Sequence, residues 1–262
     1  MNSRDQDWVA RARALTPLLN AAAPRIEEGR ALPVDVLDAL HAARMFRMLL
    51  PRSLDGAELD LATFFQVICA IVARATGRDQ IQAGGAATEP ERREQGTLYR
   101  FSATNVYQCG FAAVALGIAR AMLSSFIELA KKKTPAGGQL PLRDDHRIQT
   151  RIARSEAKLG AASAWLQQLL REMHEACAAS GKIGFEQRIR LRLAATYAIN
   201  EALEVVEASY ADAGATAIFE GNPFERRLRD MHAVSQQIQS SASHYQNVGQ
   251  HYLGMQPNLR FI

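Results

Sequence analysis

The chain has 262 residues, of which 48% are hydrophobic and 22% charged. This length can bury a sizeable core, and the composition excludes a disordered or fibrous chain. The formal net charge is +4, from 31 basic and 27 acidic residues that are scattered through the chain. Because the basic residues form no extended tract, we expect no nucleic-acid partner.

The start of the chain is polar and does not have the form of a signal peptide. No run approaches the roughly 20 apolar residues that span a bilayer, so we expect no membrane partner. Cys69, Cys109 and Cys177 are far apart and lie in apolar stretches, which predicts buried free thiols. Together these features favour the cytoplasm, where thiols stay reduced.

Shorter helices are expected in the first part of the chain. The apolar pattern predicts them over residues 8–28, 33–46 and 60–75, with a break at residues 49–56. Residues 77–96 are polar, contain glycine and show no apolar period, which is typical of a linker. We therefore expect an N-terminal helical domain at residues 1–76 and a linker at residues 77–103.

Three long helices and a fourth are predicted after the linker. Apolar residues three and four apart mark stripes over residues 107–129, 148–177 and 189–210. Gly214 stands where a C-cap glycine is expected, and the fourth helix should run from Pro223 to about Gln250 with Asn222 as its N-cap. The pattern predicts an all-α chain that ends in an antiparallel four-helix bundle, residues 104–262.

Several segments resemble the acyl-CoA dehydrogenase family. Residues 51–59 resemble its Pro-x-x-x-Gly-Gly segment, with Asp55 in place of the first Gly. Residues 107–130 resemble the first helix of its C-terminal bundle, and Gln149 falls where the second helix starts. Residues 212–239 resemble its flavin loop, because a helix stop, a tight loop and an Arg-Asp helix start follow in that order.

In that family a β domain separates the two helical domains, and flavin lies between the β domain and the bundle. Here the third helix should end near Ala75 and the bundle should begin near Thr104. The residues between them are too few for a domain of roughly a hundred residues, the commonest size. The resemblance therefore implies a chain without the middle β domain and without one wall of the usual pocket.

The reacting positions favour one branch of the family. In common acyl-CoA dehydrogenases a Glu nine residues after the Arg of the Arg-Asp pair is the base, and here that position is Ile238. No Asp or Glu follows Asp230, and an aliphatic side chain cannot remove a proton, so acyl-CoA dehydrogenation is disfavoured. Several related monooxygenases have a His one residue earlier, where this chain has Gln237.

The nearest likeness is therefore to the two-component flavin-dependent monooxygenases. They hydroxylate small apolar or aromatic substrates with reduced flavin and oxygen, and a separate flavin reductase is their partner. The resemblance implies that Gly214, Ala215, Arg229 and Asp230 bind FMN or FAD and that His232 and Gln237 are the catalytic residues. On the structural alternative, the loop is a cap and a turn, Arg229 pairs with Asp230, and His232 packs between helices.

Other charged groups have simpler explanations. Residues 144–146 and 131–133 are expected to cap helix ends, although the lysines of the second group also suit a polyanion. We expect no metal site, because a di-iron bundle needs Glu-x-x-His and no His here has Glu three residues before it.

Two functions remain open from the sequence. One is a flavin-dependent monooxygenase; the other is a non-catalytic oligomerisation or scaffold protein that lost flavin with the β domain. On either reading we expect a homo-oligomer, a dimer or tetramer, because relatives associate through the bundle and apolar surface needs cover.

Overall fold

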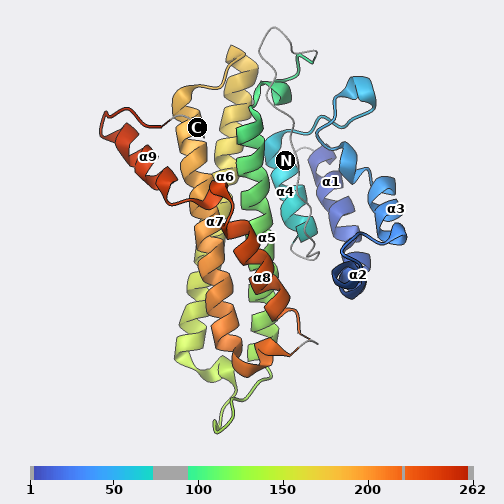
Figure 1. The fold of residues 1–262 in the computed structure, drawn as a ribbon, viewed down its shortest axis with the longest axis vertical. Coiled ribbons are helices and arrows are strands. Elements are labelled where there is room, and N and C mark those ends of the chain that lie inside the picture. Colours follow the sequence, from blue (N-terminus) through green and yellow to red (C-terminus); the bar gives the residue numbers. More distant parts are fainter. Residues whose placement is uncertain (1–2, 73–93, 220–221, 259–262) are drawn as a thin grey trace.

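The computed structural model describes residues 3–72, 94–219 and 222–258, and every regular element in those ranges is helical (Figure 1). This confirms the all-α prediction. Most of the predicted linker, residues 77–93, lies outside the described residues.

The N-terminal lobe is built from short helices. They are α1 (Ser3–Ala14), α2 (Thr16–Gly29), α3 (Val34–Ala42) and α4 (Leu61–Val72), with the 3-10 turns η1 (Met45–Arg47) and η2 (Arg52–Leu54) between the last two. The single helix predicted over residues 8–28 is wrong. The chain breaks at Leu15, because Pro17 suits the first turn of a new helix and favours a start there.

The segment before α4 explains the glycine pattern that the sequence carries. Asp55 has φ 57°, a left-handed conformation that favours glycine, and Arg44 donates to its carbonyl (2.5 Å) and carboxylate (3.0 Å) oxygens. A Cβ on Gly56 would lie 1.9 Å from the Leu50 carbonyl oxygen. Only glycine fits at position 56, whereas Arg44 supports the aspartate at position 55.

The C-terminal part is a bundle of three long helices and a shorter fourth. They are α5 (Ala103–Ala130), α6 (His146–Ser180), α7 (Phe185–Ala213) and α8 (Phe224–Ser235), and α8 lies against α5 and α7 (Figure 1). The 3-10 turn η4 (Thr97–Arg100) precedes α5, η5 (Leu142–Asp144) precedes α6, and η6 (Gly214–Ile218) lies between α7 and α8. Helix α4 packs on α5 and α6, so the lobe and the bundle share one apolar core.

The ends of the long helices follow the predicted capping chemistry. The Asp145 carboxylate accepts from the Arg147 backbone N–H at 2.8 Å and caps α6, and Gly181 and Gly214 end α6 and α7 with positive φ. Helix α5 ends at Ala130, directly before the three lysines. The predicted capping of α6 is confirmed, and the three lysines follow a helix end as predicted.

The fourth helix is shorter than predicted. It ends at Ser235, and a turn, η7 (Ile238–Ser240), leads to a separate helix α9 (Ser243–Tyr252). Serine hydroxyls compete for the backbone here: Ser235 Oγ donates to the His232 carbonyl at 3.0 Å, and Ser240 Oγ to the Gln237 carbonyl at 2.9 Å. The continuous helix to Gln250 is therefore wrong.

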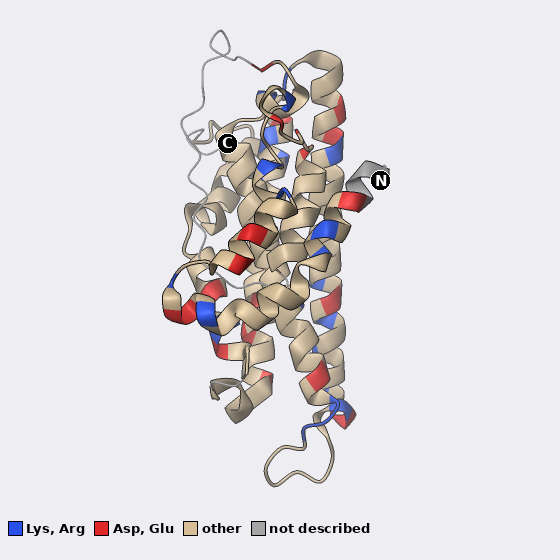
Figure 2. Ribbon diagram, turned by 90° about the vertical axis from the view of Figure 1, so that its right-hand side faces the viewer, with Lys and Arg blue, Asp and Glu red and all other residues tan. Residues whose placement is uncertain are grey.

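Helix α5 is long and apolar enough to cross a membrane by length and composition, contrary to the sequence reading, but 67% of its most apolar window is buried. That burial is typical of a core helix. Cys69, Cys109 and Cys177 are free, and Cys69 is only half-buried. Charges of both signs are interspersed along the helices (Figure 2).

Candidate functional site

Helix α8 carries three of the six residues implied by the resemblance, namely Arg229, Asp230 and His232. Phe224 and Met231 are buried on its inner side, and Arg227 anchors it by donating to the Ala121 carbonyl (3.1 Å) and to Ser125 Oγ (2.6 Å) of α5. Burial lowers the pKa of Arg227 to about 10. The position of α8 on the bundle is thus fixed by a partly desolvated arginine.

Arg229 faces outward from the same helix and joins the two lobes. It forms ion pairs with Glu27 of α2 and, at 3.3 Å, with Glu225. The negative charge of Asp230 acts on both Arg227 and Arg229. An interior pair between Arg229 and Asp230 is therefore not what the structure shows, since Arg229 is 46% exposed. To bind an anionic cofactor, Arg229 must exchange Glu27 for it.

The loop before α8 begins at Gly214, where the backbone has φ 57° and ψ −146°. Such a conformation is costly for any residue with a Cβ. Lys133 Nζ donates to the Ala213 carbonyl at 2.5 Å, and Ala215 is exposed. Asn222 does not cap α8, because Pro223 occupies the N-cap position; the Asn222 amide Nδ2 donates to the Thr216 carbonyl at 3.1 Å.

The two predicted catalytic residues lie at the other end of α8 from that loop, His232 in its last turn and Gln237 just beyond it. Helix α8 has 12 residues, so about 18 Å of helix separates the loop from its far end. His232 is 48% exposed, with Nε2 3.7 Å from the Glu207 carboxylate of α7, and Gln237 is exposed at the start of η7. The structure places Arg229 and His232 on one exposed face but does not bring Gly214 to them.

A buried polar network holds the turn that contains the predicted base position. Arg192 of α7 is completely buried, and its Nη1 donates to Gln239 Oε1 at 2.6 Å. The Gln108 amide of α5 is assigned with its oxygen toward Arg192, where it accepts from Nε (3.1 Å) and Nη2 (2.6 Å). Burial lowers the pKa of Arg192 to about 10, which leaves it charged at neutral pH.

The same turn is held from α9. His244 is buried, and its Nε2 lies 2.6 Å from the Ile238 carbonyl oxygen. A carbonyl only accepts, so Nε2 carries the proton. Burial, followed by the nearby charge of Arg192, lowers the pKa of His244.

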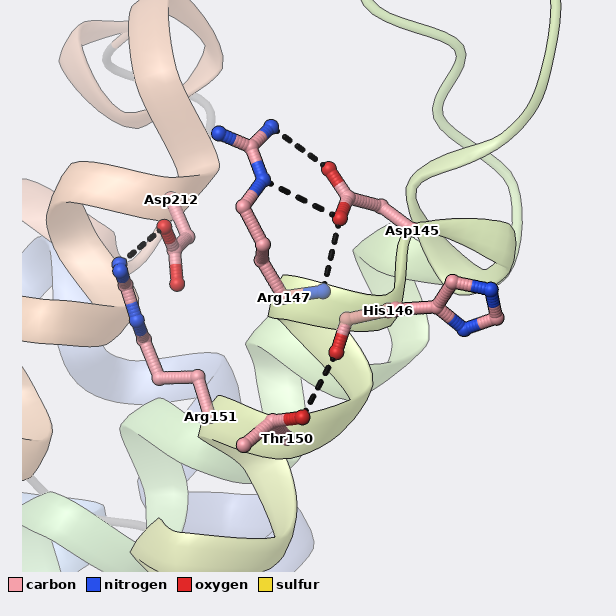
Figure 3. Close-up of polar contacts among 6 residues, drawn as sticks. All are labelled: Asp145, His146, Arg147, Thr150, Arg151 and Asp212. Atoms are coloured by element: carbon pink, nitrogen blue, oxygen red, sulfur yellow. Dashed lines mark hydrogen bonds and ion pairs between the residues drawn. The ribbon is translucent and has the colours of Figure 1, made fainter.

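A basic groove of about 600 Å³ runs between α6 and α7. Its cations, three or four residues apart on α6, are Arg147, Arg151, Arg154 and Lys158, and Glu204 of α7 also lines it. Figure 3 shows the lower end of the groove, where Arg147 contacts Asp145 at 2.8 Å and Arg151 contacts Asp212 at 2.5 Å.

The groove adjoins the predicted flavin loop, because Asp212 lies two residues before Gly214. The Arg147 side chain, then its backbone N–H, lowers the pKa of Asp145 to about 2. Exposed, fully charged arginines at a helix N-terminus suit a phosphate group. Within the described residues no cluster of His, Cys, Asp or Glu could hold a metal ion.

Sequence reasoning missed both the groove and Arg192. The groove could have been found from the spacing of the four cations on α6. Arg192 lies on the apolar stripe of α7, three residues after buried Ile189 and four before buried Thr196, and an arginine on such a stripe signals a buried polar contact.

Comparison with known proteins identifies the family. Residues 109–241, about half of the chain, match the model of the acyl-CoA dehydrogenase C-terminal domain. The chain belongs to this family. The matched range extends from within α5 through η7 and so includes the groove, the loop, Arg192 and Gln239.

Proteins similar in sequence to this chain include monooxygenases. It is 28% identical over 160 residues to an indole-3-acetate monooxygenase of Pseudomonas putida, covering 61% of this chain and 41% of that one. It is 25% identical over 143 residues to the flavin-dependent monooxygenase oxygenase subunit HsaA of Rhodococcus jostii (strain RHA1), covering 54% and 37%. The chain thus spans about two fifths of the length of these curated relatives.

The fold is shared with a solved hydroxylase. The structure of 3-HSA hydroxylase from Rhodococcus sp. RHA1 superposes with a TM-score of 0.86 at 16% identity, covering 98% of this chain and 99% of that chain. The arrangement of N-terminal lobe and bundle is therefore shared with that structure.

Proposed function

We propose that the chain is a flavin-dependent oxidoreductase of the monooxygenase type, acting on a small apolar or aromatic substrate with reduced flavin and oxygen. A separate flavin reductase would supply reduced FMN or FAD. The family, and relatives named as flavin-dependent or indole-3-acetate monooxygenases, support this proposal. When bound, the flavin would supply the oxidising chemistry. Ile238, in place of a carboxylate, argues against acyl-CoA dehydrogenation.

The observation that carries the proposal is the continuity of the basic groove with the Gly214 loop. We place the flavin phosphate in the groove, with Gly214, Ala215, Arg229 and Asp230 along the loop and α8. His232 and Gln237 would face the reacting centre.

The proposed arrangement needs two copies of the chain. The groove is lined by Glu204 and Ala208, whereas Arg192 and Thr196 hold the turn from a different face of α7. One flavin can reach both regions only if the groove of one copy lies near α8 of another. A homo-oligomer, dimer or tetramer, therefore forms part of the proposal, as do a cytoplasmic location and helical domains at residues 1–76 and 104–262.

Flavin binding tests the proposal directly. Calorimetry with oxidised and with anaerobically reduced FMN and FAD should show binding of at least one form. Neutralising the groove in Arg147→Gln/Arg154→Gln should weaken it, whereas Arg190→Gln, an exposed arginine of α7 paired with Glu172 at 3.5 Å, should not. No binding of any form at high micromolar protein contradicts the proposal.

A scaffold function is the second candidate. Several large apolar side chains are exposed in the loops and the C-terminal segment, namely Leu140, Ile218, Phe219, Tyr252, Leu253 and Met255. A non-catalytic oligomer would cover these residues and bind no flavin. Sedimentation that shows a stable monomer at micromolar concentration contradicts the scaffold function.

A further inference from the structure

The buried guanidinium of Arg192 is placed where it can control the predicted reacting position. Among the described residues it is the one Lys, Arg, Asp or Glu side chain that is buried. Removing a charged group from water is costly unless hydrogen bonds replace the lost hydration. The hydrogen bonds of Arg192 are therefore strong determinants of local structure.

Two of these hydrogen bonds fix the guanidinium and a third extends to the turn. Gln108 of α5 accepts from Nε and Nη2, which prevents the planar group from rotating. Nη1 is then directed at Gln239 Oε1, 2.6 Å away. This distance is short even for a charge-assisted bond.

Helix α7 holds the same turn at two further points. Thr196 Oγ1 donates to the Gln239 carbonyl and Asn200 Nδ2 to the Ser240 carbonyl, each at 3.1 Å. Arg192, Thr196 and Asn200 are four residues apart and form one row along α7. Helix α8 ends at Ser235, so the position of Gln237 depends on this row.

We infer that Arg192 is a positioning residue that, through Gln239, fixes residues 236–240 and with them the Gln237 side chain. The inference rests on the proposed function only in assigning Gln237 to the flavin site. Gln239→Leu removes the acceptor for Nη1, whereas Gln239→Glu retains an oxygen there. The matched control is Gln66→Leu, which removes a hydrogen bond of 3.0 Å between the side-chain amides of Gln66 on α4 and Gln167 on α6.

Hydrogen–deuterium exchange of the ligand-free full chain measures the position of the turn. Loss of a hydrogen bond to a charged group should raise exchange at residues 236–241 roughly tenfold or more in Gln239→Leu. Gln239→Glu should stay within about threefold of the parent by the same argument. Thr196→Val should give a smaller increase, and Gln66→Leu none at these residues.

A second readout reports on the site itself. The visible absorption band of bound FMN should shift in Gln239→Leu and be restored in Gln239→Glu. Parent-like exchange in Gln239→Leu and Thr196→Val, or failure of Gln239→Glu to restore it, overturns the inference. If the parent binds no flavin, the proposed function fails while the exchange data still decide the role of Arg192, so the two failures are distinguishable.

Discussion

Helix α7 has two polar faces that use arginine in opposite ways. On one face, partly exposed cations of α6 meet carboxylates of α7: Lys158 contacts Glu201 at 2.7 Å and also pairs with exposed Glu204, and Arg151 contacts Asp212 at 2.5 Å. On the other face, buried Arg192 is held by two neutral glutamine side chains. Ion pairs near the surface are weak and can exchange partners. A buried cation that loses a partner instead destabilises the fold strongly. The first face suits reversible ligand binding, and the second suits a fixed position.

The largest effect on stability is expected at the buried face. Arg192→Met leaves the oxygens of Gln108 and Gln239 buried without their donor, so the free energy of unfolding should fall by about 3 kcal/mol. Urea unfolding measures it. Arg154→Met, at an exposed arginine of the groove, should change the free energy of unfolding by about 0.5 kcal/mol or less.

A triple variant sharpens this prediction. Replacing Arg192, Gln108 and Gln239 together by apolar residues removes the unpaired groups as well as the charge, and should recover much of the lost stability. A triple variant that is no more stable than Arg192→Met would mean that shape, rather than polar pairing, dominates the buried face.

The next largest effect on stability is expected at Gly214, the residue that ends α7. Gly214→Ala forces a Cβ into a backbone conformation that glycine alone adopts easily, at a cost of about 2 kcal/mol. Gly160→Ala is the control, because a Cβ on Gly160 meets nothing within 4 Å and alanine favours helix. Thermal unfolding should move in opposite directions for the two variants.

The sequence predicted the features that depend on neighbouring residues and missed those that depend on distant contacts. The long stripes of α5, α6 and α7 and the cap at Asp145 were predictable, because period and capping are local signals. The end of α8 at Ser235 was not, since it depends on serine hydroxyls and on a distant arginine. Gly214 could be placed at the end of α7, but the pairing of Arg229 with Glu27 joins segments far apart in the chain.

A smaller, pH-dependent effect is expected at His244. Its pKa in the folded chain is lowered from 6.5, by burial first and then by Arg192, so below pH 6.5 the unfolded chain binds more protons. Stability should be full above pH 6.5 and should fall as the pH drops through the folded pKa. Urea unfolding between pH 8 and 5 measures this. The free energy of unfolding should depend less steeply on pH in His244→Gln, whose amide can still donate to the Ile238 carbonyl. An unchanged slope would contradict this assignment.

The smallest effect on stability is expected in the groove, where the effect on binding should be largest. Lys158→Gln removes contacts of a half-buried lysine with Glu201 and Glu204, and ion pairs near the surface contribute about 1 kcal/mol or less. The same change removes a positive charge from the proposed phosphate site, so FMN affinity should fall several-fold at low salt and less at high salt. Calorimetry at two ionic strengths measures this. Lost stability with unchanged affinity would show that the α6 cations serve the bundle, and the contrast between the two faces of α7 would then fail.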